Sequence, residues 1–130
     1  YGGEVGLVGS DDPDCRRCFP QESTWDLAIY ALYKQFIALR RTHAVLRTGN
    51  LVIIGGQKAA ICYLRCDVAN EKAILVAVNA DTAPTKLHFA VNRLEPFKCD
   101  KILCGSGTVC LEDEKLTITL PSRGFLLAGG

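Results

Sequence analysis

Residues 23–47, STWDLAIYALYKQFIALRRTHAVLR, form the only long segment of this 130-residue sequence with a helical repeat. Ser23 offers a hydroxyl to the free amides of the first turn, and Asp26 adds a negative charge that the helix dipole favours. Arg40 and Arg41 supply positive charge near the other end. The segment therefore predicts one long amphipathic helix. The apolar side chains gather on one helix face at three- and four-residue steps: Trp25, Ala28, Ile29, Leu32, Phe36 and Leu39.

The sequence after this helix changes to the two-residue repeat of β-strands. Short apolar or alternating runs are separated by turn residues, and Pro96 marks one further break. Residues 55–58, GGQK, are predicted to form a hairpin turn. This spacing of short strands predicts a mostly β fold, an antiparallel sandwich or barrel. The predicted strands are 51–54, 59–66, 73–79, 86–91, 101–104, 108–111, 116–120 and 125–128.

The charge balance of the sequence argues against two classes of partner. Lys and Arg total 15 against 14 for Asp and Glu, which gives a net charge of +1. We therefore expect no nucleic-acid partner, and the absence of a long apolar run or signal-peptide pattern predicts no membrane partner. The sequence contains no methionine, even at position 1, and we expect it to be part of a longer chain.

Seven cysteines are present, an odd number that cannot all pair within the chain. Several lie in or beside predicted strands as small apolar residues, and we interpret them as reduced thiols of a cytoplasmic protein. Cys15 and Cys18 have the spacing of zinc ligands, but the sequence has no second C-x2-C pair, so zinc is the weaker alternative. No glycine motif for a nucleotide is present, and we predict no cofactor.

Four segments of the chain resemble one family when they are taken in order. They are YGGEVGL at 1–7, DPDCRRCFP at 12–20, LYKQFIALRRTHAVLR at 32–47 and LPSRGFLLAGG at 120–130. Together they resemble the C-terminal part of glycoside hydrolase family 13 enzymes, the α-amylase family, of the neopullulanase and cyclomaltodextrinase type. The resemblance implies that residues 1–47 are the end of a (β/α)8 barrel, a loop plus the last helix. It also implies that residues 48–130 are the C-terminal β-sandwich.

The resemblance also implies which functional groups belong elsewhere in the parent enzyme. Retaining glycosidases use two carboxyl groups about 5 Å apart. In this family the catalytic carboxylates come from barrel strands four, five and seven, upstream of Tyr1. The resemblance therefore implies a non-catalytic part of an enzyme that hydrolyses α-glucosidic bonds. Its partner would be the catalytic barrel, and its role would be to pack against and stabilise that barrel.

The loop before the helix contains the candidate contacts to sugar, because the resemblance places it at the barrel mouth, where active sites of this fold lie. The candidates are Glu4, Asp14, Arg16 and Arg17. The alternative is that ion pairs among these charges only fix the loop, with the two arginines keeping the carboxylates ionised. The chain departs from the family at Gly3, Gln21 and Ala44, where Asp, Trp and Pro are usual. The first two departures remove a carboxylate and a flat indole from the loop.

Two further possibilities concern the partners of the chain. One is a carbohydrate-binding module that holds starch or maltooligosaccharide, for which exposed aromatic side chains are required. Trp25 invites that interpretation, but its position on the apolar stripe favours packing, and the sequence identifies no pair of exposed aromatic residues at a sugar-sized spacing. The other is a homodimer formed through the exposed helix face, or a helix folded back onto the sandwich.

Overall fold

The structure is a computed structural model that describes residues 1–94 and 97–129. The chain forms two compact units, Tyr1–Thr42 and His43–Gly130. No helix among the described residues is long and apolar enough to cross a membrane. The predicted break at Pro96 and the last residue of the predicted C-terminal domain, Gly130, lie outside the described residues.

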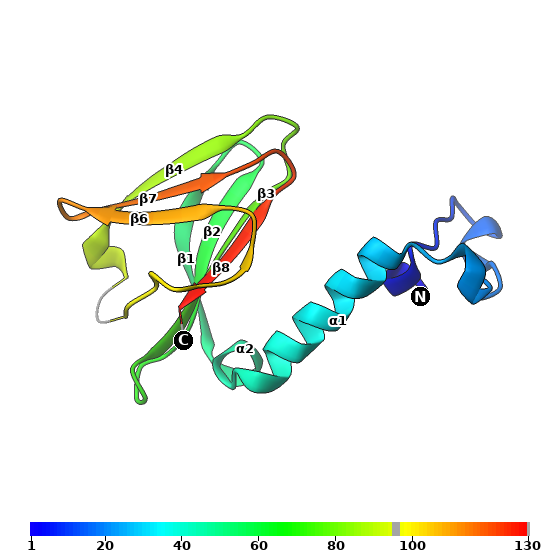
Figure 1. Cartoon of the computed structure of the whole chain (residues 1–130), viewed down its shortest axis with the longest axis horizontal. Helices are drawn as coiled ribbons and strands as arrows, with labels where there is room; N and C mark the ends of the chain where they lie inside the picture. The colour runs from blue at the N-terminus through cyan, green and yellow to red at the C-terminus, as the bar shows by residue number, and fades with distance from the viewer. Residues whose placement is uncertain (95–96, 130) are drawn as a thin grey trace. The chain divides into compact units, whose positions relative to one another are not determined.

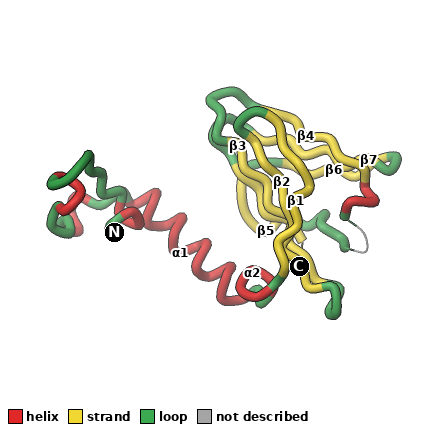
Figure 2. Tube along the Cα trace, turned by 180° about the vertical axis from the view of Figure 1, so that it is seen from behind, coloured by secondary structure: helices red, strands yellow, loops and turns green. Residues whose placement is uncertain are grey.

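The second unit is an antiparallel β-sandwich (Figures 1 and 2). One sheet has five strands in the order β1-β2-β3-β8-β5, and the other has three in the order β4-β7-β6. The neighbouring strands in both sheets are antiparallel. The predicted mostly β fold is confirmed. The strands are β1 Asn50–Gln57, β2 Ala60–Asp67, β3 Lys72–Asn79, β4 Thr85–Ala90, β5 Ile102–Gly105, β6 Thr108–Glu112, β7 Lys115–Leu120 and β8 Phe125–Gly129.

The inward-facing side chains of the two sheets form one apolar core. Cys62 and Leu64 of β2 are buried on the same face, as the two-residue repeat predicts, and they share the core with Leu116 and Ile118 of β7. Burial raises the pKa of the Cys62 thiol to about 12, and burial raises that of Cys99 to about 11. These thiols therefore remain protonated at neutral pH, which fits the interpretation of small apolar core residues.

The middle of strand β3 is covered on both faces, as its continuous apolar sequence predicts, although Val78 near its end is exposed. All residues from Ala73 to Ala77 are buried, so that Leu75 faces the core while Ile74 and Val76 are buried on the opposite face. A short helix α2, Val45–Thr48, packs against β2 and β3, and its Val45 is buried.

The predicted turn at residues 55–58 is wrong in position. Gly55 and Gly56 lie inside β1, and Gln57 pairs with Ala60, so the turn consists of Lys58 and residue 59. A register shift between Ile53 and Gly55 marks a β-bulge. A Cβ atom at Gly55 would lie 2.8 Å from the Phe89 ring, so this glycine allows a close approach between the sheets.

The predicted bounds of the long helix, residues 23–47, are also wrong, because the observed helix starts later and ends earlier. Helix α1, Leu27–Thr42, begins four residues after Ser23, and the Asp26 carboxylate accepts hydrogen bonds from the amides of Ala28 and Ile29, both at 3.0 Å. Asp26 is therefore the N-cap. At the other end, the Thr42 hydroxyl donates to the carbonyls of residues 38 and 39, which closes the last turn. Residues 45–48 then form α2 in the second unit.

Asn79 at the end of β3 is a buried polar residue that joins two turns of the sandwich. Its amide nitrogen donates to the carbonyls of Ala83 at 2.8 Å and Pro121 at 2.9 Å. Its amide oxygen accepts from the backbone N–H of Asp81 at 3.0 Å. All three bonds need a neutral amide, because only an amide both donates and accepts here.

We expect Asn79→Asp to lower the free energy of unfolding by about 3 kcal/mol, because a buried carboxylate would face two carbonyl oxygens with no proton to donate. Urea denaturation at neutral pH measures this loss. Burial beside two carbonyl oxygens raises the folded pKa of this carboxyl group, so the loss should shrink as the pH falls through that pKa and be smallest near the unfolded pKa of about 4. Asn92→Asp at an exposed position is the matched control, and equal effects of the two substitutions would contradict the assignment.

Candidate functional site

The loop that contains the predicted site residues is anchored on the start of α1. A 3-10 turn, η1 Gly3–Val5, lies between Gly2 and Gly6, whose φ angles are +81° and +76°. The buried Val5 accepts a hydrogen bond through its carbonyl from the Asp26 amide at 3.0 Å. A Cβ atom at Gly6 would lie 2.9 Å from the Asp26 Cβ, so only glycine fits this approach. The glycines of the YGGEVGL segment therefore hold the loop against the helix.

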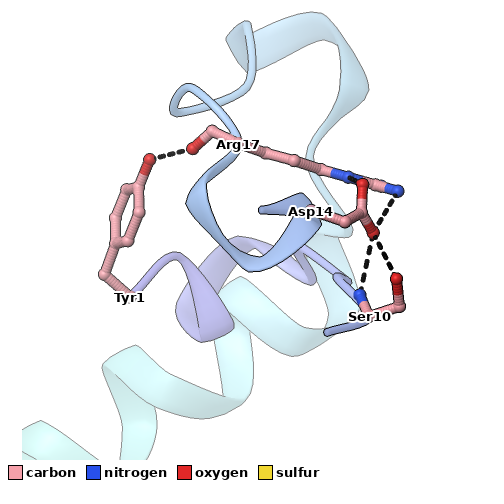
Figure 3. A network of polar contacts seen from close by, with 4 residues as sticks. All are labelled: Tyr1, Ser10, Asp14 and Arg17. Atoms are coloured by element: carbon pink, nitrogen blue, oxygen red, sulfur yellow. Dashed lines mark hydrogen bonds and ion pairs between the residues drawn. The ribbon is translucent and has the colours of Figure 1, made fainter. Parts of the chain in front are cut away.

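Asp14 organises the middle of the loop (Figure 3). It begins the 3-10 turn η2, Asp14–Arg16. Its carboxylate accepts hydrogen bonds from the Ser10 amide at 2.8 Å and the Ser10 hydroxyl at 3.0 Å. Arg17 donates to both carboxylate oxygens, from Nε at 2.7 Å and from Nη2 at 2.8 Å. The Tyr1 hydroxyl donates to the Arg17 carbonyl, which connects this network to the start of η1.

These contacts determine the charge of Asp14. Hydrogen bonds from Arg17, followed by those from Ser10, lower the pKa of the Asp14 carboxyl to about 2. The same bonds raise the pKa of Arg17. Asp14 is therefore ionised at neutral pH and has no proton to give, which excludes a general-acid role. The prediction that the arginines keep the loop carboxylates ionised is confirmed for Asp14 and Arg17.

The other predicted site residues lie outside the Asp14 network. Arg16 forms an exposed ion pair with Asp12 at 2.9 Å. Glu4 is half-buried in η1. The structure therefore brings Asp14 and Arg17 together as a loop-fixing pair, and gives Arg16 a separate partner. A role of any of these residues in contacting sugar remains a prediction.

Cys15 and Cys18, the alternative zinc ligands, are both exposed and unbridged. Among residues 1–94 and 97–129, no group of three or more His, Cys, Asp and Glu side chains could hold a metal ion. A zinc site needs four ligands, or three and a water molecule, so this pair does not form one by itself.

Sequence analysis missed a group of four aromatic residues in the first unit: Tyr1, Phe19, Trp25 and Tyr30. Trp25 precedes α1 and follows the 3-10 turn η3, Glu22–Thr24, so it is not on the predicted helix stripe. Phe19 contacts Tyr1 on one side, with ring centroids 6.2 Å apart, and Trp25 on the other at 5.9 Å. Trp25 also contacts Tyr30 at 5.2 Å. We name these four residues the aromatic cluster. No repeat in the sequence indicates it, because the loop brings Tyr1 and Phe19, which are far apart in the sequence, together.

Comparisons with known proteins find several relatives and solved structures that are similar to this chain. No protein-family model matches it. A cyclomaltodextrinase of a Bacillus species is 43% identical over 86 residues, which are 64% of this chain and 15% of that protein. Neopullulanase 2 of Thermoactinomyces vulgaris is 32% identical over 80 residues, 61% of this chain and 14% of that protein. A solved debranching enzyme of Nostoc punctiforme covers 100% of this chain at 32% identity and a TM-score of 0.87.

The β-sandwich and these likenesses relate the chain to the C-terminal part of glycoside hydrolases. It resembles the C-terminal part of enzymes of glycoside hydrolase family 13, of the cyclomaltodextrinase and neopullulanase type, as the four sequence segments predict. The chain spans only 15% of the Bacillus protein and 27% of the Nostoc chain.

We expect Arg17→Gln to raise the Asp14 pKa from about 2 toward its ordinary value of 3.8, because the largest cause of the lowered pKa is removed. An NMR titration of the Asp14 carboxyl carbon measures this. Because the folded pKa is lowered, the stabilisation of the loop by ionised Asp14 is complete above about pH 4 and is lost as the pH falls through about 2.

Arg16→Gln is the control for that titration, because Arg16 pairs with Asp12 and not with Asp14. It should leave the Asp14 midpoint unchanged. If both substitutions shifted the midpoint equally, the effect would come from net charge rather than from the Arg17 pair.

Proposed function

We propose that the chain is the non-catalytic C-terminal part of an α-glucan-active hydrolase, and that it packs against and stabilises the catalytic barrel of that enzyme. The observation that carries this proposal is the exposure of α1 to solvent. None of its 16 residues is buried, although its sequence has an apolar stripe. A helix with such a stripe gains stability in a protein mainly by burying it.

One side of α1 is the strongest candidate for the contact with the barrel. Leu32, Tyr33, Phe36, Ile37 and Arg40 surround a shallow hollow there, and we name them the α1 surface. Ile37 is 55% exposed. Contiguous exposed apolar side chains mark contact sites on soluble proteins. Residues of the barrel would cover this surface in the parent enzyme.

The outer face of the five-stranded sheet offers a second apolar surface. The strand register aligns Ile53 with Tyr63 and Val76, and it aligns Ile61 with Val78. Ile53, Ile61 and Val78 are exposed. This face is opposite the core, because the inward residues of β2 and β3 pack on the other sheet. We propose that it also contacts the parent enzyme.

In this proposal the residues of the parent perform the chemistry. The parent would hydrolyse α-glucosidic bonds with retention, using a carboxylate nucleophile and a carboxylic acid about 5 Å apart. Asp14 and Arg17 would hold the loop in one conformation, and the exposed Arg16, which pairs with Asp12, and the half-buried Glu4 would contact sugar hydroxyls. The likeness to a cyclomaltodextrinase and a neopullulanase supports this substrate class.

We expect the isolated 130-residue chain to self-associate, because the α1 surface would otherwise remain in water. Light scattering coupled to size exclusion should give a dimer at high concentration. On dilution to monomer, binding of the dye ANS should rise. Ile37→Glu should give a monomer at every concentration and should bind less ANS. A wild-type chain that is monomeric throughout and binds no ANS would overturn the proposal.

Ala38→Glu is the control for this experiment. Residue 38 is also exposed on α1, but it lies about 100° around the helix from Ile37 and outside the α1 surface. The added charge is the same in the two variants, and glutamate is a good helix former at both positions. Ala38→Glu should therefore associate as the wild type does.

The second candidate function is carbohydrate binding by the chain itself, and the exposed part of the aromatic cluster favours it. Calorimetric titration with maltoheptaose, together with an assay for reducing sugar, tests both functions. Release of sugar would contradict a non-catalytic role. Binding without release would support the second function, and neither binding nor release is expected of a purely structural role.

A further inference from the structure

Three of the seven cysteines are exposed, and two of these, Cys15 and Cys18, are separated by only two residues. The third, Cys110, lies in β6 of the second unit. The other four are buried in the second unit. A dissolved oxidant therefore reaches Cys15 and Cys18 together, and their C-x2-C spacing is the one at which paired thiols commonly exchange with a disulfide.

The 3-10 turn that contains Cys15 stops one residue short of joining the two thiols. Arg17 ends η2 in an extended conformation, with φ −59° and ψ 146°. Side chains at positions i and i+3 of a continuous 3-10 turn lie one above the other, and a disulfide needs Cα atoms about 4.4–6.8 Å apart. The φ angle of Arg17 already suits such a turn, so only its ψ angle must change, to about −25°.

A hydrogen bond holds Arg17 in the extended conformation. The Tyr1 hydroxyl donates to the Arg17 carbonyl (Figure 3), and the ψ angle of Arg17 sets the direction of that carbonyl. Changing ψ to the value of a 3-10 turn rotates the carbonyl by roughly half a turn, away from Tyr1. A Cys15–Cys18 disulfide and the Tyr1–Arg17 hydrogen bond therefore exclude each other.

We propose that Cys15 and Cys18 form a reversible disulfide, and that the Tyr1–Arg17 hydrogen bond stabilises the reduced form against it. The loop then has one conformation with two thiols and another with the disulfide. This inference goes beyond the proposed packing role of the chain and does not depend on it.

The oxidant in this exchange is a small disulfide such as glutathione disulfide. One cysteine thiolate attacks the glutathione disulfide, forms a mixed disulfide and releases one glutathione. The second cysteine thiolate attacks the mixed disulfide, forms the Cys15–Cys18 bond and releases the other glutathione. Two electrons pass from the two cysteines to glutathione disulfide, and the two thiol protons end on the two released glutathiones.

The aromatic cluster reports on this change. Tyr1 stacks on Phe19, which follows Cys18 in the sequence, and Phe19 contacts Trp25. Release of the Tyr1 hydroxyl and movement of Cys18 should therefore alter the surroundings of the Trp25 indole. Because Trp25 is the only tryptophan in the chain, its fluorescence measures this alteration directly.

The test uses the 130-residue chain with Cys110→Ser, which removes the third exposed thiol. The chain is equilibrated with mixtures of reduced glutathione and glutathione disulfide, alkylated and analysed by mass spectrometry of the fragment that contains residues 15–18. We expect the loss of two hydrogen atoms with no added glutathione, reversed by reduced glutathione, and a matching change in Trp25 fluorescence. Cys18→Ser in the same background is the control and should gain only a mixed disulfide at Cys15.

Tyr1→Phe tests the role of the hydrogen bond, because it removes the hydroxyl and keeps the ring on Phe19. Losing a bond that stabilises only the reduced form should raise the equilibrium constant for disulfide formation about fivefold. Tyr30→Phe is the matched control, since it removes a hydroxyl from the same cluster without touching the Tyr1–Arg17 bond. It should leave the equilibrium constant unchanged.

Mixed disulfides alone, or no reaction in excess glutathione disulfide, would overturn the inference that Cys15 and Cys18 pair. An equilibrium constant of Tyr1→Phe equal to that of the unsubstituted Tyr1 chain would overturn the inference that the hydrogen bond stabilises the reduced form. Neither result bears on self-association through the α1 surface, so the proposed structural role is tested separately by its own experiment.

Discussion

The five-stranded sheet is apolar on both faces, and most of the second unit depends on this constraint. Strand β3 has buried residues on both sides, Leu75 toward the core and Ile74 away from it. The three-stranded sheet covers the inner face, and α2 packs against β2 and β3. Other outer positions, such as Ile53 and Ile61, stay exposed. A sheet of this kind is typical of a domain that contacts another one.

The first unit has no extended apolar core and depends on polar contacts and the aromatic cluster. Asp26 caps α1 through its carboxylate, and its own amide binds the Val5 carbonyl, so one residue ties the loop to the helix. Asp14 and Arg17 fix the middle of the same loop. Exposed ion pairs add little to stability by themselves. Their value here lies in giving a single conformation to a loop that also holds Tyr1 and Phe19.

Errors of the sequence-based predictions have separate physical causes. Ser23 and Asp26 both suit an N-cap, and the contact of Asp26 with η1 decided between them. Gly55 suggests a turn, but here it lets Phe89 approach β1. Trp25 fits the helical repeat by spacing alone, yet it packs in the aromatic cluster outside α1. In each case a contact with a distant residue overrode a local preference.

The sequence by itself determined the strand pattern, the existence of the long helix, the family and the ionised state of Asp14. Each of these follows from neighbouring residues, because periodicity and a three-residue spacing such as that of Asp14 and Arg17 act over short distances. Only the tertiary structure decided which apolar side chains stay exposed and that Tyr1, Phe19 and Trp25 meet. Both outcomes depend on how the loop closes and how the sheets pack. Neither the loop closure nor the sheet packing can be inferred from the spacing of residues along the chain.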